Sequence, residues 1–303
     1  MDNRPDAEKT AGFLAALSAF LMWGLLPLYW KAVQSVDSME ILCHRIVWSL
    51  VFIGIILTFK ARWRETLAPL RSPRNLGILA LSSICIGINW LIYIWAVNAN
   101  HVLATSLGYY INPLVNVLFG FLFFKERLNR MQGIAIGLAA LGVINSVINY
   151  GALPWISLTL AVSFACYGVL RKIAAVESLP GLFLETSVLT PVALLYLGYL
   201  NSQGVGAFPG AETHINLLLI GAGAATAMPL IGFAYGARRL QLTTLGILQY
   251  LGPSIAFLLG VFVFGEPFGT SQFITFCFIW GGLAVYTFDS IRNLRRQRRI
   301  ARQ

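Results

Sequence analysis

Positive charge in this chain alternates with long apolar runs, and this alternation constrains the fold more than any other feature. Runs of about 20 apolar residues recur through the chain, and each is long enough to cross a bilayer core as a helix. Of the 22 Lys and Arg, 20 lie in the two tails and in four alternate gaps between the runs. Lys31 and Arg45, near the first gap, are the exceptions. Because basic loops stay on the cytoplasmic side, the pattern predicts a multi-pass membrane protein.

The spacing of the runs predicts an all-α membrane protein with ten transmembrane helices. The basic gaps lie at 60–74, 125–130, 171–172 and 238–239, and gaps without Lys or Arg lie at 98–101, 150–153, 201–213 and 265–268. Both termini are therefore expected in the cytoplasm, which requires an even number of spans. The expected spans are 12–30, 38–59, 75–97, 102–124, 131–149, 153–170, 180–200, 214–237, 243–264 and 269–288.

The composition points to a lipid environment and away from a nucleic-acid partner. Hydrophobic residues make up 57% of the chain and charged residues 11%, against about 25% charged in a soluble domain. The net charge of +10 lies in loops and in the basic tail at 291–303, where it can anchor the chain to anionic headgroups. We therefore expect the lipid bilayer as a partner, no nucleic acid, and a monomer.

Sequence motifs for catalysis or cofactor binding do not occur in this chain. The four Cys lie inside apolar runs without a CxxC pair, and the three His are widely separated. There is no GxSxG, HExxH or Walker A motif. The sequence therefore predicts no enzyme, no metal site and no cofactor.

The second half of the chain repeats motifs of the first half. Tyr110-Ile-Asn-Pro113 is matched by Tyr250-Leu-Gly-Pro253, which lies 140 positions later. Phe124-Lys-Glu126 is matched by Phe264-Gly-Glu266 at the same offset. Two matches in the same order at one offset indicate an internal duplication.

The duplication predicts two five-helix units, at 1–150 and 151–290. An odd number of spans in each unit inverts the second copy relative to the first in the membrane. Inverted repeats are frequent in transporters, because two copies that face opposite ways can rock between outward and inward openings. An inverted-repeat channel or scaffold remains the alternative.

Four segments carry a resemblance to a known family. They are Trp23-Gly-Leu-Leu-Pro-Leu-Tyr-Trp30-Lys31, Glu40-Ile-Leu-Cys-His44-Arg45, Ala234-Tyr-Gly-Ala-Arg238-Arg239 and Gln249-Tyr-Leu-Gly-Pro-Ser254. With the two five-helix units, they resemble the EamA type of the drug/metabolite transporter superfamily, and its RarD branch in particular. The resemblance implies a ten-helix carrier of the bacterial inner (plasma) membrane, usually an exporter of small metabolites or drugs. Amino-acid exporters of the YddG type belong to the same superfamily.

Polar and aromatic side chains are expected to line a central cavity. Tyr109 and Asn112 share one face of the span at 102–124, and Gln249 takes the place of Tyr109 in the second copy. The other candidates for substrate contact are Trp23, Asn89, Tyr93, Tyr167 and Tyr235. Aromatic walls with a few amides and hydroxyls suit a ligand with an apolar body and a polar head. The alternative is interhelical hydrogen bonding, worth about 0.6 kcal/mol per contact.

Charged side chains inside the expected spans are candidate functional residues. Arg45, beside His44, is about two turns from the outer end of its span, and Glu185 is about two turns from the inner end of its own. Arg45 and Glu185 are 140 positions apart, so they occupy related places in the two copies. A charge at mid-membrane costs about 2.5–3.5 kcal/mol on the insertion scale. We expect each to stabilise one closed gate; snorkelling to headgroups is the alternative.

The expected function combines these features with the resemblance. We expect a transporter, in the exporting direction, that moves small amphipathic metabolites by alternating access, with amino acids as the first candidate substrates. A drug or nucleotide-sugar class carrier is one alternative. A passive channel or a lipid-handling scaffold is another.

Overall fold

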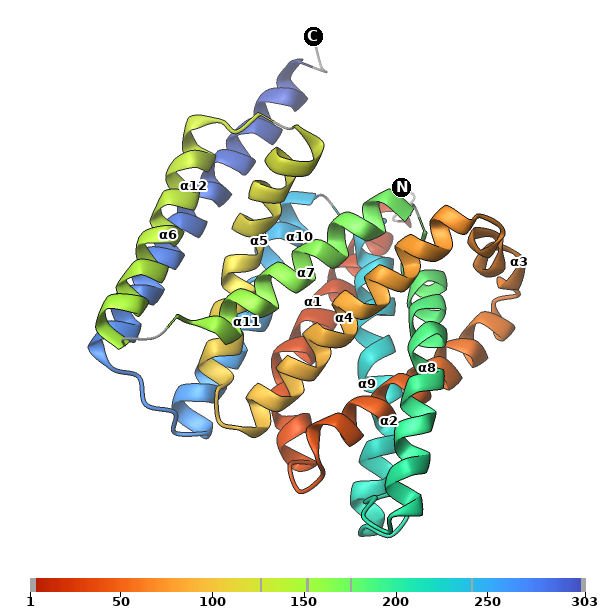
Figure 1. Cartoon of the computed structure of the whole chain (residues 1–303). Helices are drawn as coiled ribbons and strands as arrows, with labels where there is room; N and C mark the ends of the chain where they lie inside the picture. Colours follow the sequence, from red (N-terminus) through yellow and green to blue (C-terminus); the bar gives the residue numbers. More distant parts are fainter. Residues whose placement is uncertain (1–3, 126, 151–152, 175, 241, 301–303) are drawn as a thin grey trace.

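The computed structural model describes residues 4–125, 127–150, 153–174, 176–240 and 242–300, and the regular structure in these ranges is helical (Figure 1). The first half contains α1 (Arg4–Ala32), α2 (Ser38–Phe59), α3 (Trp63–Leu67), η1 (Ala68–Arg71), α4 (Pro73–Asn98), α5 (Val102–Phe124) and α6 (Arg130–Tyr150). The second half contains α7 (Trp155–Ala174), α8 (Ser178–Ser202), α9 (Thr213–Ala237), α10 (Leu242–Leu248), α11 (Leu251–Leu258), η2 (Leu259–Val263) and α12 (Thr270–Ile300). Glu126, one of the repeat residues, lies outside the described ranges.

Nine helices in the described part of the chain are long and apolar enough to cross a membrane. They are α1, α2, α4, α5, α6, α7, α8, α9 and α12. Each overlaps one of the spans expected from the sequence, and α2 has the bounds that the apolar run predicts. The structure is therefore that of a multi-pass helical membrane protein.

The prediction of one continuous helix over 243–264 is wrong. The segment is divided into α10, α11 and the π-helix η2, with a break at Gln249 and Tyr250. Pro253 lacks an N–H, and its ring collides with the carbonyl of the residue four positions earlier, which is Gln249. In α5 the equivalent Pro113 is accommodated within an unbroken helix. Gly252, where α5 has Asn112, further lowers the helix propensity at the break.

The helices pack in pairs drawn from both halves of the chain. α1 packs on α9, α2 on α8 and α9, and α4 and α5 on α7. α6 and α12 run side by side along one edge of the molecule, and α11 crosses between α1 and α5 (Figure 1). Small residues allow these helices to pack closely. A Cβ on Gly108 of α5 would lie only 2.9 Å from the Ser157 carbonyl oxygen of α7, which is too close for a larger residue.

Large apolar side chains cover the outer surface of the bundle. Leu195, Phe262 and Ile148 are each more than 70% exposed, on three different elements. In water, apolar surface of this extent would drive association. A bilayer covers it instead, in agreement with the membrane assignment.

Candidate functional site

Arg45 of α2 is buried among aromatic rings in the core of the bundle. Its side chain is 5% exposed, and its Nε donates a hydrogen bond to Thr226 Oγ1 of α9 at 3.0 Å. The guanidinium lies 4.1 Å from the ring centroid of Trp90 and 5.1 Å from that of Trp30. The negative faces of these indoles partly compensate its charge, by about 2 kcal/mol for a desolvated contact.

Two of the predicted substrate residues lie beside this guanidinium. Tyr93 of α4 and Tyr109 of α5 form a T-shaped pair with ring centroids 5.6 Å apart. Tyr93 belongs to the same buried cluster as Trp30 and Trp90, the two rings that face Arg45, and Tyr109 packs against that cluster. The structure therefore joins Tyr93, Tyr109 and Arg45 in one cluster, although the sequence placed the tyrosines in the cavity and the arginine at a gate.

Asn89 and Asn112 tie helices together. The Asn89 amide nitrogen donates to the Leu160 carbonyl and to Ser163 Oγ of α7, at 3.0 Å in each case. The Asn112 amide nitrogen donates to the Ala161 carbonyl at 3.3 Å. These contacts agree with the interhelical alternative that the sequence left open, and they hold α4 and α5 against α7.

Glu185 of α8 is fully buried in a second polar cluster. Its carboxylate accepts hydrogen bonds from Ser82 Oγ of α4 at 2.8 Å and from the Tyr167 hydroxyl of α7 at 3.2 Å. Arg171 Nη1 lies 3.6 Å from the same carboxylate. The charge of Glu185 is thus compensated within the protein, as a buried carboxylate requires.

The two clusters use positions that the sequence offsets relate between the two halves of the chain. Arg45 and Glu185 are 140 positions apart, and their partners Ser82 and Thr226 are 144 apart. Arg45 joins α2 to α9, and Glu185 joins α8 to α4. Thr226 is not among the residues that the sequence predicts. Trp23 and Tyr167 are also 144 positions apart, and the same offset applied to Ser82 leads to Thr226.

The other predicted substrate residues have partners elsewhere. Trp23 packs with Phe233 of α9 at a centroid distance of 5.7 Å. Tyr235 is 40% exposed, and the Arg239 guanidinium lies 3.6 Å from its ring centroid. Gln249 lies in the break between α10 and α11, and its N–H donates to the Leu245 carbonyl at 2.9 Å.

His44 belongs to a pocket near the N-terminal end of α2. Its ring lies 5.0 Å from that of Phe208, and its Nε2 is 3.9 Å from Glu40 Oε1. Glu40 accepts the backbone N–H groups of Ala207 and Phe208 at 2.8 and 3.2 Å. The pocket has a volume of about 470 Å³ and extends to α8. The side chains of His44 and its neighbour Arg45 therefore lie in different environments: His44 lines this pocket, and Arg45 lies among the buried aromatic rings.

Glu266 caps the N-terminal end of α5, a role that the sequence did not predict. Its carboxylate accepts the backbone N–H groups of Val102 and Leu103, the latter at 2.8 Å. An anion at this position satisfies free N–H groups and interacts favourably with the helix dipole. Nearby, Lys31 Nζ donates to Asn100 Oδ1 at 2.6 Å.

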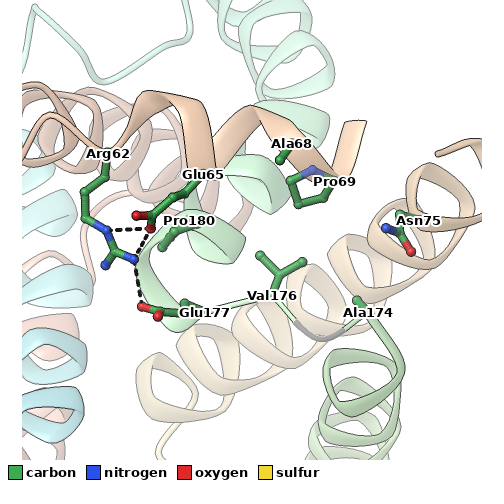
Figure 2. Close-up of a pocket in the computed structure, with 9 residues that line it drawn as sticks. All are labelled: Arg62, Glu65, Ala68, Pro69, Asn75, Ala174, Val176, Glu177 and Pro180. Carbon is green, nitrogen blue, oxygen red and sulfur yellow. Dashed lines mark hydrogen bonds and ion pairs between the residues drawn. The ribbon is translucent and has the colours of Figure 1, made fainter. Parts of the chain in front are cut away.

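Glu177 links the segments before α3, before α8 and after α9, and it borders a second pocket of about 360 Å³ (Figure 2). Its carboxylate accepts hydrogen bonds from Arg62 at 3.0 Å and from Arg238 at 2.8 Å. The hydrogen bond from Arg62 is the main cause that lowers the pKa of Glu177 below its usual value. Figure 2 also shows Arg62 binding Glu65 of α3. The sequence carried no signal for this network except the basic gaps themselves.

The described residues do not include a group of three or more His, Cys, Asp or Glu that could hold a metal ion. The polar clusters instead join helices within a bundle that lipid surrounds. Such an arrangement defines a helical membrane protein with ionisable groups between its helices.

Comparison with known proteins identifies the family. Residues 10–148 match the EamA-like transporter family. The chain is 48% identical to the uncharacterized transporter YojE of Bacillus subtilis, over 94% of this chain and 96% of the relative. It is 44% identical to Protein RarD of Escherichia coli, over 96% and 99%. A solved crystal structure at 20% identity shares the fold, with a TM-score of 0.58 over 91% of this chain and 97% of that chain. This chain belongs to the EamA-type drug/metabolite transporters, in the RarD branch.

Proposed function

We propose that this membrane transporter exports small amphipathic metabolites, with amino acids as the first candidates, by alternating access in a bacterial inner membrane. The proposal includes ten membrane-crossing segments in two inverted units, 1–150 and 151–290, with a basic cytoplasmic tail at 291–303. It also includes cytoplasmic termini, because 20 of the 22 basic residues then lie on that side. The broken segment from α10 to η2 is the tenth crossing.

The observation that carries the proposal is the matched pair of polar contacts. Arg45 with Thr226 and Glu185 with Ser82 join equivalent helices of the two copies. The packing follows the same relation, since α1 on α9 is the counterpart of α4 on α7. Matched contacts in inverted copies are what a rocking mechanism needs, because one set can open while the other stays closed.

In this mechanism the two buried charges act on opposite gates. Arg45 lies toward the outer end of α2 and closes the outer side through Thr226. Glu185 lies toward the inner end of α8 and closes the inner side through Ser82. Removing either contact destabilises one closed state by about 1–2 kcal/mol, enough to shift a balanced equilibrium about five- to thirty-fold.

Substrate would contact the aromatic and polar groups between the gates. Tyr93 and Tyr109 already lie together in the core, and Trp23, Tyr167 and Gln249 complete the proposed walls. Asn89 and Asn112 would reach substrate only if a rocking motion releases their contacts with α7. An aromatic cavity with few polar groups suits an apolar body with a polar head.

Cysteine accessibility tests the gates in Arg45→Ala and Glu185→Ala variants. The reporter is Asn116→Cys, an exposed polar position on the predicted cavity face of α5, in a chain whose native cysteines are replaced by alanine. We expect Arg45→Ala to raise labelling from the outside and Glu185→Ala to raise it from the inside. The same direction of change in both variants, or no change in either, would contradict the gate assignment.

A channel is the competing function, and it predicts a different response. A continuous pore would leave the reporter cysteine accessible from both sides at once in the unaltered protein. A carrier exposes it to one side at a time, so that opening one gate lowers labelling from the other side.

A further inference from the structure

The buried charges of the two repeats are compensated unequally. Glu185 has Arg171 as a cationic neighbour at 3.6 Å. For Arg45, no carboxylate of the described residues lies within 4 Å, and its Nη1 is buried without a hydrogen-bond partner. A guanidinium keeps its charge at any accessible pH, so this positive charge cannot be removed by losing a proton.

The surroundings of Arg45 satisfy only part of what a buried guanidinium needs. Thr226 accepts from Nε, and the faces of Trp30 and Trp90 attract the positive charge. None of these groups carries a negative charge. A buried charge without a counter-charge is costly in a membrane protein and marks a functional site by default.

We infer that Arg45 binds the carboxylate of the transported substrate, so that the transporter selects small carboxylic acids with an apolar body. The inference rests on the proposed function and names the substrate class of that site. A guanidinium presents two N–H donors to the two oxygens of a carboxylate, which gives geometric as well as electrostatic recognition. The phenols of Tyr93 and Tyr109 belong to the same cluster and could donate hydrogen bonds to a carboxylate bound there.

The charge count favours a carboxylate over a phosphate. A phosphate group carries about −1.5 to −2 at neutral pH, and one guanidinium compensates only about −1 of it. The nearest basic residue of α1, Lys31, is engaged at the outer end by Asn98 and Asn100. Arg171 already faces Glu185. A single carboxylate therefore matches the available positive charge.

Carboxylate binding would also couple the substrate to the outer gate. Within the described part of the chain, the one hydrogen bond that Arg45 makes is to Thr226 of α9. A carboxylate would compete with Thr226 for the guanidinium. Substrate binding would thereby weaken the contact that joins α2 to α9 and favour separation of these helices.

Matched ligand pairs test the inference on the purified full-length protein. The probes are L-phenylalanine, L-leucine and L-threonine, each paired with its carboxamide, which keeps the ammonium and side chain but loses the negative charge. Binding is measured by thermal stabilisation, read with a dye that reacts with the membrane-embedded cysteines as they become exposed. We expect at least one acid to bind ten-fold or more tightly than its amide.

Variants then assign the preference to Arg45. Arg45→Gln should abolish the difference between acid and amide, and Arg45→Lys should keep it in weakened form. Arg64→Gln makes the same substitution at an exposed position of α3 and should leave the difference unchanged. The comparison in the unaltered protein needs no variant, so it stands even if Arg45→Gln does not fold.

Equal binding of acids and amides, or failure of every acid to bind, would overturn the inference. A preference for acids that survives in Arg45→Gln would overturn it as well. Acid binding that depends on Arg45 without transport in proteoliposomes would leave the inference intact and contradict the proposed function instead.

Discussion

At the scale of single residues, two buried charged side chains lie between helices from opposite halves of the chain. Arg45 and Glu185 are 5% and 0% exposed, and each contacts a hydroxyl on a helix of the other half. The sequence could predict that both charges are special, because charges inside apolar runs are expensive. It could not predict that Arg45 lies beside Tyr93 and Tyr109, since that depends on how three helices cross.

Tyr109 and Gln249 give a prediction at this scale. Tyr109→Ala and Gln249→Ala should each lower transport while leaving the amount of protein in the membrane unchanged. Both positions lie four residues before a proline, where a carbonyl is released from helical hydrogen bonding and can face a cavity. Transport at limiting and saturating substrate measures the effect, and Tyr109→Phe controls for the ring. Normal transport by both alanine variants would place the cavity elsewhere.

At the scale of helices and linkers, the apolar runs predicted most elements because length and hydropathy are enough to define a span. The exception is the segment from α10 to η2. Pro113 and Pro253 occupy equivalent positions, yet only the second interrupts its helix. The two prolines differ in their surroundings as well as in the neighbouring Asn112 and Gly252: α5 is packed against α7, and Ser106 of α5 donates to the Pro253 carbonyl at 2.8 Å. Contacts between helices of this kind cannot be predicted from the sequence of a single apolar run.

The linker before α8 gives a second prediction. Glu177→Gln should lower thermal stability at neutral pH, because the charged hydrogen bonds from Arg62 and Arg238 are lost. The pKa of Glu177 is lowered in the folded protein. Its contribution is therefore present above the pKa of the unfolded chain and is lost as the pH falls through the folded pKa.

The measurement is the difference in unfolding temperature between the unaltered protein and Glu177→Gln across pH. We expect the difference to disappear at acidic pH, below the usual range of a glutamate. Glu65→Gln is the matched control, because Glu65 binds Arg62 but does not reach α9. A difference that stays constant with pH would show that the charge of Glu177 does not contribute.

At the scale of the whole molecule, the distribution of basic residues predicts the orientation. Reporter fusions at Gln303 and Ser202 should read cytoplasmic and external, respectively, because the C-terminal tail is basic and the segment around Ser202 has no Lys or Arg. An external signal at Gln303 would contradict both the even number of crossings and the inversion of the second unit.

The central claim is that the two units alternate around a substrate site, and counterflow in proteoliposomes tests it most directly. Vesicles are loaded with a high concentration of one unlabelled amino acid, and uptake of a trace of the same labelled compound is followed across a panel. The account predicts saturable uptake that rises transiently above the equilibrium level for at least one member. Uptake that is linear with concentration and never exceeds equilibrium, or no uptake across the panel, would contradict it.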